Sequence, residues 1–182
     1  MMNAASKVTH DADHPVLMLA AQLGQLLQTQ QGWVATAESC TGGLLAGALT
    51  AIPGSSQWFD QGWVTYSNEA KNKQLGVLPQ TLEHHGAVSQ ATAIEMACGV
   101  LTQTPQATLA ISTTGIAGPG GATPGKPVGL VWFAWAHRSA GGVEVLCEHH
   151  VFKGDRSEVR LAAVAYALEH AMSFLRQADP HF

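Results

Sequence analysis

Apolar residues recur at helical spacing in three long segments of the chain. They follow one another at intervals of three or four residues, which places them on one face of an α-helix. The first segment spans 14–31 and ends before Gly32, the second opens at Ser89 and runs to about Gln103, and the third opens at Asp155. Their apolar positions are Val16, Leu19, Leu23, Leu26 and Leu27, then Ile94, Ala97 and Leu101, then Leu161, Val164, Leu168, Met172 and Leu175. We therefore expect three amphipathic helices, the last with a capping box formed by Asp155 and Glu158.

Shorter apolar stretches between glycines and prolines predict strands. They cover residues 33–37, 61–67, 107–112, 128–136 and 143–152, and Gly141-Gly142 joins the last two as an antiparallel hairpin. Two short helices are also expected, one over 44–52 before Pro53-Gly54 and one capped by Asn68 before Pro79. Strands thus alternate with helices before a hairpin and a closing helix. This order predicts an α/β fold, a three-layer α/β/α sandwich around a mixed, mostly parallel sheet.

Length and composition fit one compact domain. The chain has 182 residues, of which 46% are hydrophobic and 12% charged, so we expect a single domain over 13–182 after a polar, flexible extension over 1–12. The low surface charge leaves room for a homodimer or larger homo-oligomer. A formal net charge of -4 without a basic stripe argues against nucleic-acid binding.

The cysteines and the longest apolar runs bear on location. Cys40, Cys98 and Cys147 are odd in number and lack C-x-x-C spacing, which is typical of a reducing cytoplasm. Apolar runs fall short of the roughly 20 residues that a membrane helix requires. We therefore expect a cytoplasmic protein that does not bind membranes.

A serine and a lysine are the main candidates for chemistry. Ser39 stands where a predicted strand gives way to the glycine turn at Gly42-Gly43, and Lys71 lies in a region nearly empty of other cations. A lysine can activate a serine hydroxyl if it is neutral, which requires desolvation or a nearby cation such as Lys73. Tyr66 offers a phenol that can relay a proton between them. The alternative is that Lys71 and Lys73 are ordinary solvated helix residues.

Other nucleophile arrangements are less favoured by the sequence than this pair. The members of the adjacent histidine pairs 84–85 and 149–150 point in different directions, and the chain has neither a G-x-S-x-G nor an H-E-x-x-H motif, so a Ser/His site is disfavoured. Cys40 is a rival nucleophile, or else a small buried packing residue. The stretch 120–126 matches the first part of a phosphate-binding P-loop, but Pro127 stands where that motif needs a hydroxyl. An NTPase is therefore disfavoured as well.

Two further groups could hold an anion. Backbone amides of Thr41, Gly42 and Gly43, at a predicted helix start, are candidates for an oxyanion hole. Arg156 and Arg160 share one helix face near its positive end, where they would either attract a phosphate or pair with acids such as Glu158.

Several motifs together make the chain resemble the CinA carboxy-terminal family. They are Ala37-Glu38-Ser39-Cys40-Thr41-Gly42-Gly43, Tyr66-Ser67-Asn68-Glu69-Ala70-Lys71 and Gly115-Ile116-Ala117-Gly118-Pro119-Gly120-Gly121, with shorter pieces at 53–56, 85–89, 126–129 and 154–156. The resemblance covers nearly everything from Gln31 onward. One departure is Thr114, where relatives usually have Ser before Gly-Ile-Ala-Gly-Pro.

The resemblance implies a function and a set of roles. Members of the family hydrolyse the carboxamide of nicotinamide mononucleotide to nicotinate mononucleotide and ammonia, without a metal or other cofactor. Carried over by position, Ser39 would be the nucleophile, Lys71 the base and Tyr66 its helper. The residues expected to contact the small-molecule substrate are Glu38, Thr41, Gly42, Gly43, Asn68, Thr114, Gly115, Gly118 and Arg156. Two alternatives remain: a catalytically silent nucleotide-binding or regulatory module, and an amidase for another small carboxamide.

Overall fold

The computed structural model describes residues 15–178 and contains helices and strands in the order expected for an α/β protein. The predicted extension over 1–12 lies outside these residues. The elements are α1 (Pro15–Thr29), β1 (Val34–Glu38), α2 (Leu44–Thr50), the 3-10 helix η1 (Ser55–Gln57), β2 (Phe59–Val64), α3 (Asn68–Leu75), α4 (Pro79–His85), α5 (Gln90–Gln103), β3 (Leu109–Gly115), β4 (Leu130–Ser139), β5 (Gly142–Val151) and α6 (Arg156–Ala178).

The strands form one mixed sheet in the order β2-β1-β3-β4-β5. β1 pairs in parallel with β2 and β3, whereas β4 is antiparallel to both β3 and β5. Only β4 therefore runs against the other strands of this sheet. The chain leaves β1 toward β2 on one side and meets β3 on the other, so a crevice is expected at the carboxyl ends of β1 and β3.

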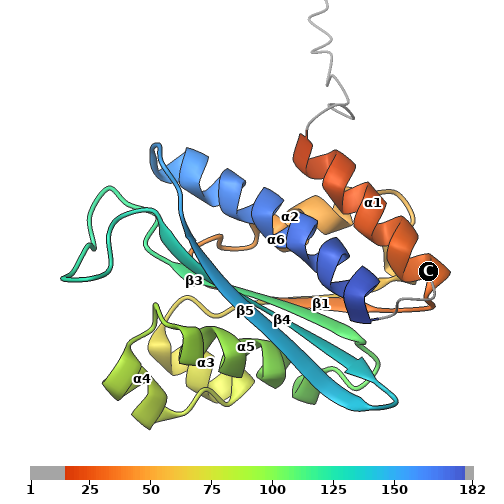
Figure 1. The fold of residues 1–182 in the computed structure, drawn as a ribbon, viewed down its shortest axis with the longest axis horizontal. Coiled ribbons are helices and arrows are strands. Elements are labelled where there is room, and N and C mark those ends of the chain that lie inside the picture. Colours follow the sequence, from red (N-terminus) through yellow and green to blue (C-terminus); the bar gives the residue numbers. More distant parts are fainter. Residues whose placement is uncertain (1–14, 179–182) are drawn as a thin grey trace, which may run out of the picture.

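Helices cover both faces of the sheet, as Figure 1 shows: α1, α2 and α6 lie on one face, and α3, α4 and α5 lie on the other. Alternation along the strands gives each face its own core. Val34 of β1 and Ile111 of β3 pack in the core beneath α1 and α6. Their neighbours Ala35 and Ala110 pack in the core beneath α5. The three-layer α/β/α sandwich predicted from the sequence is confirmed.

Close approach between layers depends on a glycine in α1. A methyl group added at Gly24 would meet the buried indole of Trp58 at 2.6 Å. Glycine at this position therefore lets the segment before β2 pack directly against the helix.

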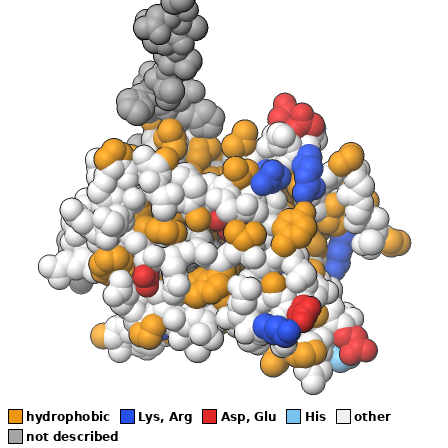
Figure 2. Space-filling model, turned by 180° about the vertical axis from the view of Figure 1, so that it is seen from behind, with side chains coloured by type: hydrophobic (Ala, Val, Ile, Leu, Met, Phe, Trp, Pro, Cys, Tyr) orange, Lys and Arg blue, Asp and Glu red, His pale blue; other side chains and the backbone are white. Residues whose placement is uncertain are grey.

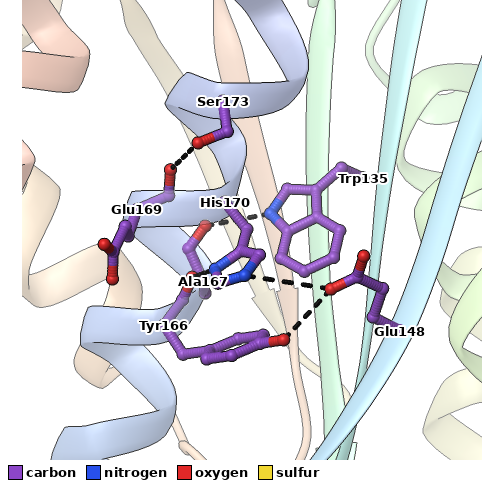
Figure 3. Close-up of polar contacts among 7 residues, drawn as sticks. All are labelled: Trp135, Glu148, Tyr166, Ala167, Glu169, His170 and Ser173. Atoms are coloured by element: carbon purple, nitrogen blue, oxygen red, sulfur yellow. Dashed lines mark hydrogen bonds and ion pairs between the residues drawn. The ribbon is translucent and has the colours of Figure 1, made fainter.

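A polar and aromatic cluster ties α6 to the β4–β5 hairpin (Figure 3). The Trp135 indole donates to the Ala167 carbonyl at 2.9 Å, and the Tyr166 hydroxyl donates to Glu148 at 3.0 Å. His170 stacks on Tyr166, and its Nε2 lies 3.8 Å from a carboxylate oxygen of Glu148. Burial, together with the hydrogen bond to Glu148, raises the pKa of Tyr166 to about 12. These contacts fix the course of α6, whose first turns reach the turn after β1 that begins with Ser39.

The caps of three helices test the sequence predictions directly. The Asp155 carboxylate accepts from the amides of Ser157 and Glu158, and Glu158 accepts from the Asp155 amide at 2.7 Å, which confirms the capping box. Ser89 caps α5 as predicted. The prediction for α3 was wrong by one residue, because Ser67 accepts from the Ala70 amide and Asn68 is the first helical residue.

β2, α4 and η1 differ from the sequence prediction. β2 begins and ends earlier than the predicted strand over 61–67, because residues 65–67 leave the sheet to start α3. The short helices α4 and η1 were not predicted, since neither has enough apolar residues to show a period.

Charged side chains are sparse on the face seen in Figure 2, where lysine and arginine lie in small separate groups among hydrophobic and uncharged polar residues. Within residues 15–178, no helix combines the length and the apolar character that a membrane crossing needs.

Candidate active site

The predicted nucleophile and base meet at the carboxyl ends of the parallel strands. Ser39 directly follows β1, Thr114 and Gly115 end β3, and Lys71 comes from α3, which follows β2. Ser39 extends the pairing of β1 with β3 by one hydrogen bond, from its amide to the Thr113 carbonyl at 2.9 Å. The switch point of the sheet therefore presents the Ser39 hydroxyl at the crevice.

Lys71 is buried beside Ser39, with 1% of its surface exposed. Its Nζ lies 3.0 Å from Ser39 Oγ, 2.8 Å from the Thr65 carbonyl and 3.4 Å from the Tyr66 carbonyl. Desolvation lowers the pKa of Lys71 from its ordinary value of 10.5 to about 8. The alternative of a solvated lysine is thereby excluded for Lys71.

The three partners of Lys71 suit a neutral amine. A neutral amine has two N–H donors and one lone pair, which match two backbone carbonyls that only accept and a serine hydroxyl that can donate. In that state the Ser39 hydroxyl can donate its proton to the Lys71 lone pair, which is the arrangement that a general base requires.

Lys73 takes no part in this arrangement, contrary to the suggestion from the sequence. It is 71% exposed and pairs with Glu69 at 2.6 Å, one helical turn away. The pKa of Lys71 is lowered by burial, and Cys40 opposes this shift. Side chains two positions apart on a helix point in different directions, so the Lys73 ammonium does not lie near the Lys71 amine although the two residues are close in sequence.

Cys40, the rival nucleophile, is in an unfavourable state for attack. Burial raises the pKa of its thiol to about 12, although the amides of Cys40 and Thr41 oppose this shift. Because the thiolate is the reactive form of cysteine, such a thiol is inert near neutral pH. The packing alternative therefore fits Cys40, which joins the apolar core beneath the site.

Tyr66 is near the pair, but its phenol points elsewhere. The side chain is 60% exposed, and its hydroxyl lies 2.9 Å from a guanidinium nitrogen of Arg156. Lys71 contacts the backbone carbonyl of Tyr66 and not its phenol. Tyr66 thus forms a wall of the site and holds Arg156 in place, and the proton relay proposed from the sequence is not formed in this structure.

Glu38, predicted to contact substrate, is instead an internal anchor. It is completely buried, and its carboxylate accepts from the amides of Gly43, Leu45 and Ala46 at 2.8 to 3.0 Å. These amides belong to the first turn of α2 and its preceding residue, where backbone donors lack helical partners. Glu38 therefore fixes the turn that follows Ser39.

The glycine turn differs in detail from the predicted oxyanion hole. The Gly43 amide is bound by Glu38, and the Gly42 amide donates to the Ser39 carbonyl at 3.1 Å. Both glycines have positive φ, 60° at Gly42 and 96° at Gly43, which permits the sharp turn. The amides of Cys40 and Thr41 have no oxygen partner within residues 15–178. Among the amides of this turn, those two therefore remain without an oxygen acceptor, and they are the candidates for an oxyanion hole.

A cavity of about 210 Å³ opens on the pair. Its walls are formed by Ser39, Cys40, Tyr66, Lys71, Ala87, Val88, Thr114, Gly115, Ala117 and Arg156. An adjoining cavity of about 530 Å³ shares Ala117 and Arg156 with the first and continues past Gly118 and Pro119 to the start of α6.

The remaining predicted site residues lie in these cavities, in the interior or on the surface. Thr114 and Gly115 line the first cavity, and the Thr114 hydroxyl donates to the Ala87 carbonyl at 2.7 Å. Gly118 lines the second. Thr41 is buried with its hydroxyl 2.7 Å from that of Thr113, and Asn68 is exposed at the start of α3; neither lines a wall.

The two arginines of α6 have separate partners. Arg156 donates to the Gly118 carbonyl at 2.8 Å and reaches the rim of both cavities. Arg160 points behind Ser39 and donates to the carbonyls of Cys40 and Thr41. Neither pairs with Glu158 or with any other acid in the described part of the chain, so the acid-pairing alternative does not hold.

Sequence reasoning missed two components of the site. One is the backbone segment at Ala87 and Val88, which forms a wall without any polar side chain that would reveal it. The other is the contact of Arg160 with the turn, for which the spacing of Arg156 and Arg160 was the available signal. No group of three or more His, Cys, Asp or Glu side chains within residues 15–178 is placed to hold a metal ion.

Fold and site together define an α/β protein with a buried serine–lysine pair, the arrangement of a lysine-assisted serine hydrolase. The family model for the CinA C-terminal domain matches residues 17–175. The chain belongs to the CinA C-terminal domain family.

Named relatives and solved structures agree with this assignment. The Escherichia coli (strain K12) nicotinamide-nucleotide amidohydrolase PncC is 48% identical over 157 residues, covering 86% of this chain and 93% of the relative. The enzyme of the same name from Pseudomonas putida is 45% identical, covering 85% and 94%. The crystal structure of the competence/damage inducible protein CihA from Agrobacterium tumefaciens is similar with a TM-score of 0.83 and 46% identity, covering 88% and 95%.

Proposed function

We propose that this chain is a nicotinamide-nucleotide amidohydrolase, which converts nicotinamide mononucleotide and water to nicotinate mononucleotide and ammonia. The observation that carries the proposal is the buried contact of 3.0 Å between Lys71 Nζ and Ser39 Oγ. The substrate is suggested by the relatives named nicotinamide-nucleotide amidohydrolase, which match nearly their whole length.

The first half of the reaction forms an ester on Ser39. Neutral Lys71 takes the hydroxyl proton as Ser39 Oγ attacks the carboxamide carbon, and the carbonyl oxygen becomes an oxyanion. The amides of Cys40 and Thr41 stabilise that oxyanion. The Lys71 ammonium then returns the proton to the nitrogen, and the carbon–nitrogen bond breaks to release ammonia.

The second half hydrolyses the ester with the same groups. Lys71, neutral again, accepts a proton from a water molecule whose oxygen attacks the ester carbon. Collapse of the second oxyanion releases Ser39 Oγ, which recovers its proton from Lys71. Ser39 and Lys71 end in the states in which they began.

The two cavities suggest how the substrate lies. The carboxamide and pyridine ring fit against Ser39 in the cavity of about 210 Å³, and the phosphoribosyl group extends into the adjoining cavity of about 530 Å³. Arg156 lies between them, so its guanidinium is the proposed partner of the phosphate. Amides at the start of α6 are less suited to this role, since those of Ser157 and Glu158 are bound by Asp155.

Tyr66 is proposed to assist in two indirect ways. Its backbone carbonyl accepts from Lys71, and its phenol holds Arg156 at the rim. A Tyr66→Phe variant keeps the carbonyl and the ring, so it isolates the hydroxyl. We expect weaker substrate binding in this variant and a smaller effect on the step at Ser39.

Incubation of the purified protein with nicotinamide mononucleotide tests the proposal. We expect stoichiometric ammonia and nicotinate mononucleotide, and a loss of at least about a hundredfold in Ser39→Ala and Lys71→Ala. Nicotinamide and glutamine, offered in parallel, should react poorly because neither carries a phosphate for Arg156. Binding of the nucleotide without ammonia would instead establish a catalytically silent module, and preference for glutamine or nicotinamide would establish an amidase of another substrate.

Location and assembly are also proposed. Cytoplasmic location is supported by three free cysteines, Cys40, Cys98 and Cys147. Assembly as a homodimer or larger homo-oligomer is supported by β5, an edge strand on which Val143, Val145 and Val151 are exposed. Light scattering of the purified protein gives the oligomeric state directly, and a monomeric mass would reject this part of the proposal.

A further inference from the structure

Arg160 reaches from α6 to the turn that follows Ser39. Its Nε donates to the Cys40 carbonyl at 3.1 Å, and one of its terminal nitrogens donates to the Thr41 carbonyl at 2.8 Å. The same terminal nitrogen would lie 3.2 Å from a methyl group added at Gly42, so the guanidinium packs directly against the turn. Two nitrogens of one guanidinium thus donate to two consecutive backbone carbonyls in the turn after Ser39.

Arg160 donates to these two backbone carbonyls and has no acidic partner among the described residues. The side chain is half-buried, and no carboxylate within residues 15–178 lies at ion-pair distance from it. Arg156, one turn earlier on the same helix, differs because it faces the cavities. A guanidinium without an acid partner is costly to bury, and hydrogen bonds to two carbonyls are what compensate it here.

Peptide geometry carries the effect of Arg160 to the Cys40 and Thr41 amides, the proposed donors to the oxyanion. In a trans peptide the C=O and N–H bonds point in opposite directions. Fixing the Cys40 carbonyl therefore fixes the Thr41 amide, and fixing the Thr41 carbonyl fixes the Gly42 amide. The Gly42 amide donates to the Ser39 carbonyl at 3.1 Å, which in turn sets the direction of the Cys40 amide.

We propose that Arg160 is a positioning residue, which aims and polarises the Cys40 and Thr41 amides toward the oxyanion formed at Ser39. The two chains of hydrogen bonds that begin at the guanidinium end on these amides. Successive hydrogen bonds polarise one another, so a positive charge at the start strengthens the donors at the end. The effect grows as negative charge develops on the substrate oxygen, and Arg160 therefore favours the transition state over the bound substrate.

The choice of arginine follows from the two contacts. A lysine offers a single ammonium on a flexible stem, whereas the planar guanidinium presents two donors at fixed separation. Arg160→Lys keeps the charge and loses the fork, and Arg160→Met removes both. Arg176→Met is a matched control, because Arg176 is exposed in the last turn of the same helix.

Steady-state kinetics give the first test, which rests on the proposed function. We expect kcat for nicotinamide mononucleotide to fall by about 10- to 100-fold in Arg160→Met, by less in Arg160→Lys, and to stay unchanged in Arg176→Met. Affinity for the nucleotide, measured in a Ser39→Ala background, should change by less than about twofold, because Arg160 does not touch the substrate site. A wild-type kcat in folded Arg160→Met, or an equal loss of affinity and turnover, would overturn the inference.

Labelling of Ser39 by an alkyl fluorophosphonate gives a test that does not depend on the natural substrate. Attack of Ser39 on phosphorus displaces fluoride, and the phosphoryl oxygen gains charge at the place of the oxyanion. The rate of label incorporation should fall at least about tenfold in Arg160→Met, with partial recovery in Arg160→Lys. Failure of the wild type to hydrolyse the nucleotide would reject the proposed function, whereas equal labelling of wild type and both Arg160 variants would reject the role of Arg160. If Arg160→Met does not fold, as judged by circular dichroism, Arg160→Lys decides the question.

Discussion

The pH dependence of the reaction tests the state of Lys71 quantitatively. A base with a pKa of about 8 is neutral in about one molecule in ten at pH 7 and in about nine in ten at pH 9. The value of kcat/KM should therefore rise about tenfold between these pH values and level off above pH 9. A lysine with the ordinary pKa of 10.5 would give a rise of about a hundredfold over the same range and no plateau.

The assay measures ammonia release at low concentrations of nicotinamide mononucleotide from pH 7 to pH 10. This range lies above the second phosphate pKa of about 6, so the substrate does not change its charge. Arg176→Met serves as control and should show the same profile, because Arg176 is exposed in the last turn of α6 and does not contact Lys71. A tenfold rise per pH unit continuing to pH 10, or a flat profile, would refute the argument that burial of Lys71 supplies the base.

The same difference in pKa affects stability. The folded protein releases the Lys71 proton above about pH 8, and the unfolded chain keeps it to about 10.5, so the unfolded state binds more protons in that window and stability rises with pH. The contribution is about 3 kcal/mol, at about 1.4 kcal/mol for each tenfold change in the protonation equilibrium. Urea unfolding of wild type and Lys71→Met at several pH values isolates it, since other titrating groups are common to both proteins. If the free energies of unfolding of wild type and Lys71→Met changed with pH in parallel, the lowered pKa of Lys71 would be contradicted.

Three substitutions test the other roles. Glu38→Ala should lower the free energy of unfolding by about 3 kcal/mol or more, because three amides lose a charged acceptor; urea unfolding measures this, and a loss below about 1 kcal/mol would contradict the anchor role. Arg156→Ala should raise KM for nicotinamide mononucleotide at least about tenfold with a smaller change in kcat, and an unchanged KM in steady-state assays would remove Arg156 from the phosphate site. Cys40→Ala should keep kcat within about threefold of wild type, since a thiol of pKa about 12 does not attack; a loss comparable to that of Ser39→Ala would count against this assignment.

Local sequence patterns predicted those parts of the fold that depend on local chemistry. The capping box at Asp155, the serine cap of α5 and the hairpin at Gly141-Gly142 each depend on residues close together in the chain. α4 and the true position of β2 depend on tertiary contacts, such as the burial of Trp58 against Gly24, and local patterns carry little trace of these.

The site shows the same division. The serine–lysine pair was predicted from a hydroxyl at the end of a strand and a lysine in a region nearly empty of other cations. That the two side chains meet depends on the parallel pairing of β1 with β2, which places the carboxyl ends of these strands side by side. The roles of Glu38 and Arg160 were beyond the sequence, because nothing local shows that a carboxylate turns inward to a helix start or that a guanidinium crosses from α6 to a turn about 120 residues earlier. The direction of the Tyr66 phenol is equally a matter of tertiary packing.

Acid quenching of the reaction followed by peptide mass spectrometry tests the central claim most directly. During turnover of nicotinamide mononucleotide, the account predicts a nicotinate mononucleotide ester on the peptide that contains residues 38–43, with fragmentation placing the added mass on Ser39. The adduct should be absent from Ser39→Ala and should persist in Cys40→Ala. An adduct on Cys40, or sustained ammonia release by Ser39→Ala, would contradict the account.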